Sequence, residues 1–210
     1  MELLIVGCHR SGTTLLASMI GAHKDIAIVN EDFYNSYSKI VSKKIVGTKM
    51  VIPTLDYDKK KGFILTSILG NKYIQKILFY LFWWIRYISI TNKYFYKVCT
   101  YSIKDFIDKK AKIIFISRDV EENVKSILKY KKQTERTAKG DVLRTRYIKH
   151  KLQDSGYKDV LYITLQELTH TPELTIKRIC EFLDIEYDNK MLEGYKYNPT
   201  YSWDGLLKQN

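Results

Sequence analysis

The sequence has 210 residues, 45% of them hydrophobic, which is enough apolar material for the packed core of one domain. Its 35 Lys and Arg residues against 23 Asp and Glu residues give a net charge of +12, which favours anionic partners such as a nucleotide, an acidic glycan or a membrane surface. Three widely spaced cysteines exclude a disulfide framework and a zinc-binding pattern, so we expect free thiols in a reducing compartment. Because the apolar residues begin at Leu3, we expect no signal peptide, and therefore a cytoplasmic protein.

The first apolar run leads directly into a glycine loop. Residues 3–6 predict a buried strand, residues 7–12 a tight loop between two glycines, and apolar residues at helical spacing a helix up to Ile20. A loop of this kind directs backbone N–H groups and the positive end of a helix dipole at one point, and therefore predicts an anion-binding site. Thr13 stands where nucleoside triphosphate enzymes use a lysine on the terminal phosphates, and the cationic residue is instead Arg10. This exchange favours a ligand with less negative charge at its reacting end, such as a sulfuryl group.

The segment Cys8–His23 resembles the 5′-phosphosulfate loop of sulfotransferases, which use 3′-phosphoadenosine 5′-phosphosulfate (PAPS). The resemblance implies that PAPS is the co-substrate, that no metal ion takes part, and that Arg10 and the loop hold the 5′-phosphosulfate. The loop residues concerned are Ser11, Gly12, Thr13 and Thr14. The structural alternative is an ordinary strand, turn and helix in which this motif arose by chance.

A second strand is predicted at residues 26–29 and is followed by two carboxylates. In the family's tyrosine-modifying members a glutamate general base lies on this element, as far along the chain from the loop arginine as Glu31 is from Arg10. The resemblance therefore implies that Glu31 is the catalytic base. Asp32 is the rival carboxylate, and a solvated loop residue without a catalytic role is the structural alternative.

The next segment, Val46–Pro53, resembles the family's Gly-Asp-Lys-Thr-Pro-like segment, whose lysine lies near the transferred group. This match implies a catalytic role for Lys49. It is a partial match, because Thr48 replaces the usual acidic or polar residue and the proline comes late. An ordinary lysine in a lysine-rich chain is the alternative.

Residues 59–104 form a stretch without Asp or Glu, with nine Lys or Arg residues and many aromatic residues. Its apolar run Ile77–Ile85 is too short to span a bilayer. Typical relatives have fewer residues here, so the resemblance marks a basic, aromatic helical insertion that covers the acceptor pocket. Docking on a membrane surface and a buried core helix with outward-reaching lysines are the alternatives.

A further buried strand is predicted at Lys112–Ser117. Asp119 is expected to cap the following helix, with Glu122 as its capping-box partner. The expected inner stripe of that helix is Val120, Val124, Ile127 and Leu128. Arg118, with Ser126 eight residues later, resembles the family's 3′-phosphate site, because a guanidinium forks onto phosphate and a hydroxyl adds a donor.

The carboxy-terminal part closely resembles the family's strand-helix unit. A basic helical region is predicted at 133–151, a buried strand at 159–164, and a helix with Pro172 at its first position. Relatives often carry Tyr-Glu-Asp-Leu where this chain has Leu165–Leu168, so a tyrosine contact to the nucleotide is missing.

Together these features predict a three-layer α/β fold with a mainly parallel sheet around a P-loop-like core, and a single domain over residues 1–210. The resemblance implies a sulfotransferase that moves a sulfuryl group from PAPS to an acceptor hydroxyl of a glycan, a lipid or a tyrosine, with an amine as the second choice. The alternatives are a P-loop nucleotide kinase, which would need the missing lysine, and a non-catalytic basic binder of anionic membrane or nucleic acid. We expect no nucleic-acid partner, because no nucleic-acid motif is visible.

Overall fold

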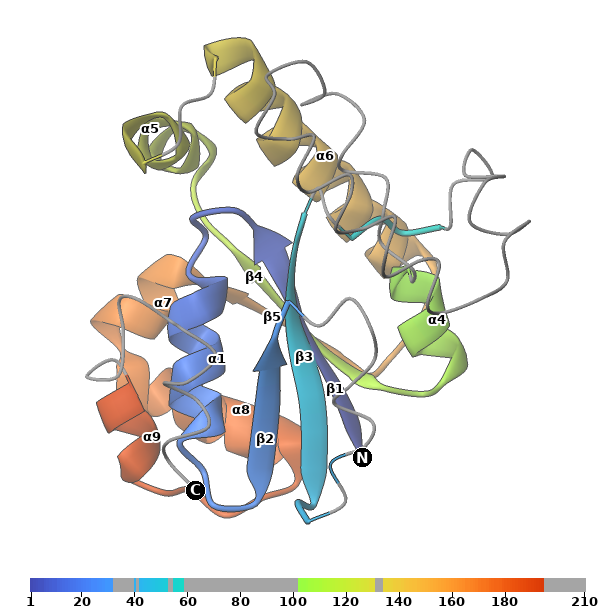
Figure 1. The fold of residues 1–210 in the computed structure, drawn as a ribbon, viewed down its shortest axis with the longest axis vertical. Coiled ribbons are helices and arrows are strands. Elements are labelled where there is room, and N and C mark those ends of the chain that lie inside the picture. The colour runs from blue at the N-terminus through green and yellow to red at the C-terminus, as the bar shows by residue number, and fades with distance from the viewer. Residues whose placement is uncertain (32–39, 41, 53–54, 59–101, 131–133, 195–210) are drawn as a thin grey trace, which may run out of the picture.

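The structure is a computed structural model that describes residues 1–31, 40, 42–52, 55–58, 102–130 and 134–194. The strands in these ranges are β1 (Glu2–Cys8), β2 (Ile26–Asn30), β3 (Ile45–Ile52), β4 (Lys112–Ser117) and β5 (Val160–Thr164). They form one all-parallel sheet in the order β2-β3-β1-β4-β5 (Figure 1). The helices are α1 (Thr13–Gly21), α4 (Ile103–Asp108), α5 (Val120–Tyr130), α6 (Glu135–Asp154), α7 (Leu165–His170), α8 (Pro172–Leu183) and α9 (Lys190–Glu193).

The central strand is β1. It pairs with β3 on one side and β4 on the other, with Val6 opposite both Met50 and Phe115. Residues 3–6 are fully buried, as expected for a parallel strand that has helices on both faces. Because all the strands run the same way, the loops that follow them emerge at one edge of the sheet. In α/β proteins this carboxyl edge is where ligands bind, at the point where the chain changes sides.

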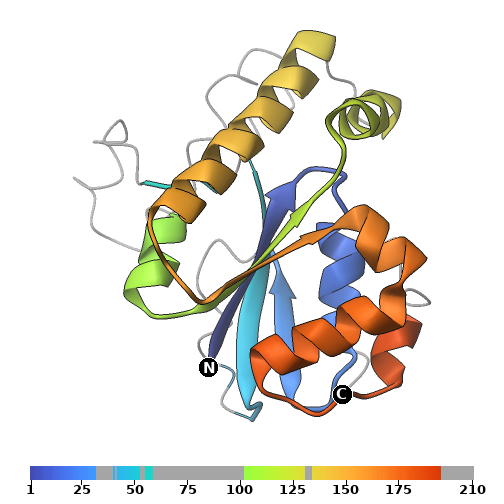
Figure 2. The same ribbon diagram turned by 180° about the vertical axis from the view of Figure 1, so that it is seen from behind.

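Helices cover both faces of the sheet (Figures 1 and 2). On one face α1, α8 and α9 pack against alternate strand residues, including Leu3 and Ile5. On the other face α4 and α6 pack against the intervening residues, including Leu4 and Val6. This alternation follows from the two-residue period of a strand. The predicted three-layer α/β fold with a parallel sheet is therefore confirmed.

Most of the predicted elements correspond to observed ones. The strands expected at 26–29, 112–117 and 159–164 are β2, β4 and β5, and the helical region at 133–151 is α6. Pro172 begins α8, as the sequence indicated. The proposed insertion at 59–104 lies outside the described residues, except for positions 102–104, which form the cap and the start of α4.

The sequence did not reveal β3 or α7. The strand β3 contains Gly47, Thr48 and Lys49, a run that does not resemble the interior of a sheet. Gly47 is required there, because a Cβ would lie 2.3 Å from the carbonyl oxygen of Leu3 in β1. Thr48 satisfies its hydroxyl by donating to the carbonyl of Val29 in β2 at 3.0 Å.

Two expectations for α5 were wrong. Leu128 is 37% exposed, because the buried face of α5 is centred on Asn123, Val124 and Ile127 and Leu128 lies at the edge of that face. Asp119 does cap the helix, with Oδ1 accepting from the N–H groups of residues 121 and 122. The capping box does not form, because the carboxylate of Glu122 binds a guanidinium instead.

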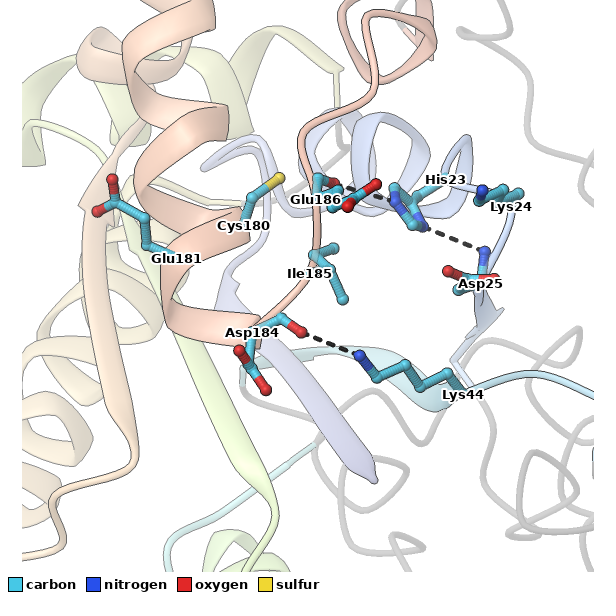
Figure 3. A pocket seen from close by; sticks show the side chains of 9 residues that line it. All are labelled: His23, Lys24, Asp25, Lys44, Cys180, Glu181, Asp184, Ile185 and Glu186. Atoms are coloured by element: carbon cyan, nitrogen blue, oxygen red, sulfur yellow. Dashed lines mark hydrogen bonds between the residues drawn. The ribbon is translucent and has the colours of Figure 1, made fainter.

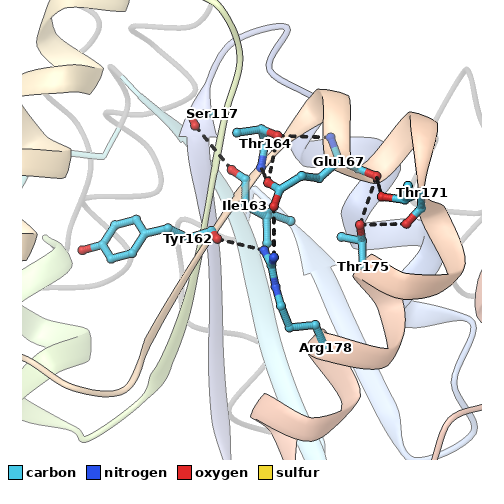
Figure 4. Close-up of polar contacts among 8 residues, drawn as sticks. All are labelled: Ser117, Tyr162, Ile163, Thr164, Glu167, Thr171, Thr175 and Arg178. Carbon is cyan, nitrogen blue, oxygen red and sulfur yellow. Dashed lines mark hydrogen bonds and ion pairs between the residues drawn. The ribbon is translucent and has the colours of Figure 1, made fainter.

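A hydrogen-bonded network around Glu167 holds the turn from β5 into α7 (Figure 4). Thr164 Oγ1 accepts from the N–H of Glu167, while Glu167 Oε2 accepts from the N–H and the hydroxyl of Thr164. Arg178 of α8 donates to Glu167 Oε1 and to the carbonyl of Tyr162. Burial opposes ionisation of Glu167, but the hydrogen bonds from Thr164 and Arg178 outweigh it and lower the pKa of the carboxyl. The network thereby fixes where α7 begins and where its first residue, Leu165, lies.

We expect Glu167→Gln to lower stability in a pH-dependent way. Because the pKa of Glu167 is lower in the folded chain than in the unfolded chain, ionisation favours folding. This contribution is complete above the ordinary value of 4.5 and is lost as the pH falls through the folded pKa. Urea unfolding should therefore show the largest difference between wild type and variant near neutral pH, and a smaller one in acid.

The matched control is Glu173→Gln, which removes an exposed carboxylate of α8 that pairs with Lys177. It should have little effect on stability, because an exposed ion pair contributes little. Equal losses in the two variants would contradict the role given to Glu167.

Candidate functional site

The loop between β1 and α1 has a backbone that few residues tolerate. Arg10 and Gly12 have positive φ values of 64° and 91°, and the second of these strains any residue with a side chain. A Cβ at Gly12 would also lie 2.6 Å from Cδ1 of Leu165. Gly12 is the N-cap of α1 and has no side chain with which to cap it. The first N–H groups of the helix therefore receive no capping group from that position and can serve an anion.

Ser11 ties this loop to the neighbouring strand. Its side chain is fully buried, and its Oγ donates to the carbonyl oxygen of Cys8 at 2.8 Å and lies 3.4 Å from that of Ile116 in β4. Its backbone N–H also donates to Cys8. The loop approaches β4 so closely that a Cβ on Gly7 would lie 2.3 Å from the carbonyl oxygen of Ile116. Ser11 thus shapes the loop from inside, while Arg10 lies on its exposed side.

Arg118 follows β4 directly and lies beside the loop. Its Nη1 donates to the carbonyl oxygen of Arg10 at 3.5 Å, and its Nε donates to Glu122 Oε2 at 3.3 Å. Gln166 of α7 donates to the same oxygen of Glu122 at 3.2 Å. The two arginines predicted for the two ends of a nucleotide therefore lie side by side, where the carboxyl ends of β1 and β4 meet.

One face of α5 is turned toward Arg10. Glu122, Ser126 and Tyr130 are four residues apart and therefore lie on the same face of the helix. Glu122 contacts Arg118 at one end of this face, and the guanidinium of Arg10 lies over the ring of Tyr130 at the other. Ser126, half-buried between them, is thereby brought to the same side of α5 as the two arginines.

The sequence did not identify Tyr130 as a residue of the site. It predicted that Glu122 would form a capping box with Asp119, whereas Glu122 pairs with Arg118. The four-residue spacing from Ser126 is the signal that would have placed both residues on the site face of the helix. Leu165 was noted only for the tyrosine that it replaces, and the structure places it against Gly12 of the loop.

Glu31 and Lys49 form an ion pair at the end of β2. The N–H of Glu31 donates to the carbonyl of Lys49 at 2.7 Å, and Lys49 Nζ lies 3.0 Å from Glu31 Oε1. The side chain of Lys49 is 3% exposed and that of Glu31 is 41% exposed. Because β3 is the strand next to β1, Lys49 lies one strand away from the glycine loop, opposite Ile5.

The environment of this pair alters the basicity of the lysine. Burial removes hydration from the ammonium and lowers the pKa of Lys49, although the carboxylate of Glu31 pulls it in the opposite direction. A buried ammonium needs such a countercharge. The result is a partly exposed carboxylate with a cation directly behind it, an arrangement that can accept a proton and keep a positive charge close to the reacting atoms.

An open pocket of about 450 Å³ lies at the opposite, amino end of β2 and β3 (Figure 3). Its lining includes His23, which accepts from the N–H of Asp25 at Nδ1 and bonds through Nε2 to the carbonyl of Glu186. Lys44 donates there to the carbonyl of Asp184. None of the residues predicted to be functional lines this pocket, so the carboxyl edge remains the candidate site.

Cys8 and Cys180 are not in a disulfide bond, as expected, and both are buried. Burial raises the pKa of Cys180 to about 11, so this thiol stays protonated and unreactive at neutral pH. Cys8 packs against Val124 and Ile127 of α5. Cys99 lies outside the described residues.

The model of the sulfotransferase domain family matches residues 1–200, nearly the whole chain. The chain belongs to the sulfotransferase-domain family. This agrees with the resemblance carried by the glycine loop and by the segment around Arg118. Among curated proteins, this sulfotransferase-domain sequence has no significant match.

Two solved structures share the fold of this sulfotransferase-domain chain. Mouse sulfotransferase SULT7A1 complexed with PAP is 18% identical, with a TM-score of 0.55 over 93% of this chain and 62% of the mouse chain. The sulfotransferase domain from the curacin biosynthetic pathway is 12% identical, with a TM-score of 0.52 over 92% of this chain and 77% of that one. The chain thus spans less than two thirds of the mouse protein. In the part of the sulfotransferase-domain chain that the structure describes, no helix combines the length and apolar character needed to cross a bilayer.

The ion pair leads to a prediction about stability. Glu31→Gln should leave the buried ammonium of Lys49 without its countercharge, at a cost of roughly 1–3 kcal/mol in the free energy of unfolding. Lys49→Met should cost less, because it replaces the ammonium with an apolar chain of similar length that a buried site accepts. Urea unfolding of the ligand-free variants measures this difference.

Glu181→Gln, which neutralises an exposed carboxylate of α8, serves as the control and should behave like wild type. If Glu31→Gln and Lys49→Met proved equally destabilising, the lysine would not depend on Glu31 for its charge.

Proposed function

We propose that this chain transfers a sulfuryl group from PAPS to an acceptor hydroxyl. The observation that carries the proposal is the hydrogen bond from Arg118 to the carbonyl of Arg10, which brings together, at one edge of the sheet, the two arginines that the sequence predicted to bind anions. PAPS has anionic groups at both ends of its ribose, so two adjacent arginines suit it. The family model supports sulfuryl transfer in general, and the mouse sulfotransferase of similar fold was obtained in complex with PAP.

The 5′-phosphosulfate is assigned to the glycine loop. Gly12, Thr13 and Thr14 offer N–H groups at the start of α1, where the helix dipole favours negative charge. Arg10 adds a fork of N–H donors from the loop itself. Ser11 contributes indirectly, because its buried hydroxyl holds the loop in shape. The missing loop lysine is consistent with a transferred group of lower charge than a phosphoryl group.

The 3′-phosphate is assigned to Arg118 and Ser126. Arg118 is already neutralised by Glu122 in the free protein, so an incoming phosphate has to replace or share that carboxylate. Phosphate carries more charge than a carboxylate and offers more acceptor oxygens, which favours the exchange. The hydroxyl of Ser126 lies on the same face of α5 and adds a donor that has no charge to compensate.

Glu31 and Lys49 are assigned to the chemical step. A bond forms between the acceptor oxygen and sulfur, the bond from sulfur to the bridging oxygen of the nucleotide breaks, and the acceptor proton passes to the carboxylate of Glu31. As Glu31 becomes neutral, its attraction for Lys49 weakens. The ammonium then remains as an uncompensated positive charge close to the leaving oxygen, where negative charge develops.

The acceptor is proposed to be a hydroxyl of a glycan, a lipid or a tyrosine, with an amine as the second choice. Residues 59–104 are proposed to form a basic, aromatic insertion that borders the acceptor within a single domain spanning residues 1–210. Contact of this insertion with a membrane surface is the alternative. A cytoplasmic location, the absence of a metal ion from the reaction and the absence of a nucleic-acid partner remain part of the proposal.

Binding experiments test the donor. The protein should bind PAPS without magnesium, and Arg118→Ala should remove charge-assisted hydrogen bonds worth roughly 1.5–3 kcal/mol each. The same change should spare adenosine 5′-phosphosulfate, which lacks the 3′-phosphate. Ser126→Ala should also lower the affinity for PAPS, but by less, because the hydroxyl that it removes is neutral. Isothermal titration calorimetry with both nucleotides measures the difference.

Arg146→Ala removes an exposed arginine of α6 and is the control for the loss of charge alone. Equal losses for the two nucleotides would move Arg118 out of the 3′-phosphate site. Tight, magnesium-dependent binding of ATP without any response to PAPS would overturn the proposed function and favour a P-loop kinase. Preferential binding of an oligonucleotide would favour a non-catalytic basic binder.

Turnover tests the base. Glu31→Gln should lower turnover by about 10²–10⁴-fold, because the proton acceptor is lost. It should leave the affinity for PAPS nearly unchanged, because Glu31 is not assigned to the nucleotide. Transfer of labelled sulfuryl groups to panels of glycans, lipids and tyrosine peptides provides the measurement and also identifies the acceptor. The neighbouring change Asp32→Asn is the control and should be milder. If Asp32→Asn abolished transfer while Glu31→Gln turned over normally, the base would be the adjacent residue.

A further inference from the structure

The guanidinium of Arg10 stacks on Tyr130 in the free protein. Cζ of Arg10 lies 4.2 Å from the centre of the Tyr130 ring, whereas Nζ of Lys129, the other cation over this ring among the described residues, is 5.3 Å away. Arg10 belongs to the glycine loop and Tyr130 is the last residue of α5. The contact therefore joins the loop to the far end of that helix. Tyr130 is 60% exposed, so burial of the ring is not what holds it in place.

Stacking occupies the face of a guanidinium and leaves its edges free. The five N–H donors of an arginine lie in the plane of the group and point outward from its rim. An arginine on an aromatic ring can therefore still fork onto a phosphate or a sulfate. The ring attracts the cation and restrains a side chain that would otherwise sample many rotamers. A restrained arginine loses less conformational freedom when its ligand binds.

The main chain at this position is restrained as well. The carbonyl of Arg10 accepts a hydrogen bond from Arg118, and its φ of 64° is held by the tight loop around it. Arg118 thus fixes the backbone of Arg10, and Tyr130 fixes its side chain. Neither contact uses the N–H donors of Arg10, so with respect to the described residues these donors remain available to an oxyanion.

We propose that Tyr130 is a positioning residue that holds Arg10 ready for the sulfuryl-bearing end of the nucleotide. The identity of that nucleotide rests on the proposed function, whereas the role of Tyr130 toward an oxyanion does not. The ring, and not the hydroxyl, does the positioning. Ser126 lies one turn earlier on the same face of α5, so this helix serves both ends of the nucleotide, through a hydroxyl at one end and an aromatic ring at the other.

Affinity measurements test the proposal. Tyr130→Ala should raise the Kd for PAPS by about 2- to 5-fold, the effect of losing an exposed cation–π contact. Tyr130→Phe keeps the ring and should bind like wild type, and it keeps the test decisive if the alanine variant folds poorly. Tyr147→Ala is the matched control: Tyr147 of α6 is 57% exposed and lies under Lys151, remote in sequence from the loop. This variant should bind PAPS with the same Kd as wild type.

A spectroscopic readout separates positioning from a general structural effect. The Nε–Hε proton of Arg10, assigned through its loss in Arg10→Lys, should show a ring-current shift in the free protein. Tyr130→Ala should abolish that shift and Tyr130→Phe should keep it. Titration with inorganic sulfate, followed on the same resonance, measures binding of an oxyanion at Arg10 without any nucleotide, and Tyr130→Ala should weaken it by a similar factor.

The outcomes distinguish this assignment from the proposed function. An Arg10 resonance that is the same in wild type and Tyr130→Ala would overturn the stacking. Unchanged or tighter binding of sulfate by Tyr130→Ala would overturn the positioning role. A wild-type protein that fails to bind PAPS, but whose sulfate binding weakens in Tyr130→Ala and not in Tyr147→Ala, would contradict the proposed function and support the role of Tyr130.

Discussion

The close contact between β1 and β4 is the constraint on which the rest of the site depends. Gly7 has no room for a side chain against the carbonyl of Ile116, and Ser11 bonds the loop to the same region from inside. Because the loop is held against β4, the first residue after β4, Arg118, reaches the carbonyl of Arg10. A wider gap at this point would separate the two arginines, and the proposed nucleotide could no longer contact both.

Three cations among the described residues of the candidate site are each restrained in a different way. Arg118 pairs with a carboxylate in partial exposure, Arg10 stacks on an aromatic ring, and Lys49 is buried against a carboxylate. These restraints differ in what a ligand must displace. Under the proposed function, an anion competes with Glu122 for Arg118, whereas no described residue competes for the donors of Arg10. The buried pair is neutral overall, so under the same proposal its charge takes part only when Glu31 accepts a proton.

The elements with strong local signals were predictable. The apolar runs of β1 and β4 and the proline that begins α8 report burial and backbone preference directly. The strand β3 was missed because its signal is not local. A strand with glycine, threonine and lysine in its middle is tolerated only because β1 leaves no room for a side chain at Gly47 and Glu31 compensates the charge of Lys49. The helix α7 does carry a local signal, the capping box between Thr164 and Glu167, which was overlooked, and Arg178 from the next helix adds a contact to Glu167.

By itself, the sequence determined the glycine loop and the residue types at the candidate anion site, because positive φ values and helix starts depend on neighbours in the chain. It also determined the family, because the family model matches the sequence over residues 1–200. Only the tertiary structure decided the partners of the site residues. Glu31 and Lys49 are 18 residues apart, and Arg10 and Arg118 are 108 apart. Residues so distant meet because parallel strands bring their carboxyl ends to one edge of the sheet, and strand order, which no local pattern encodes, sets which ends are neighbours.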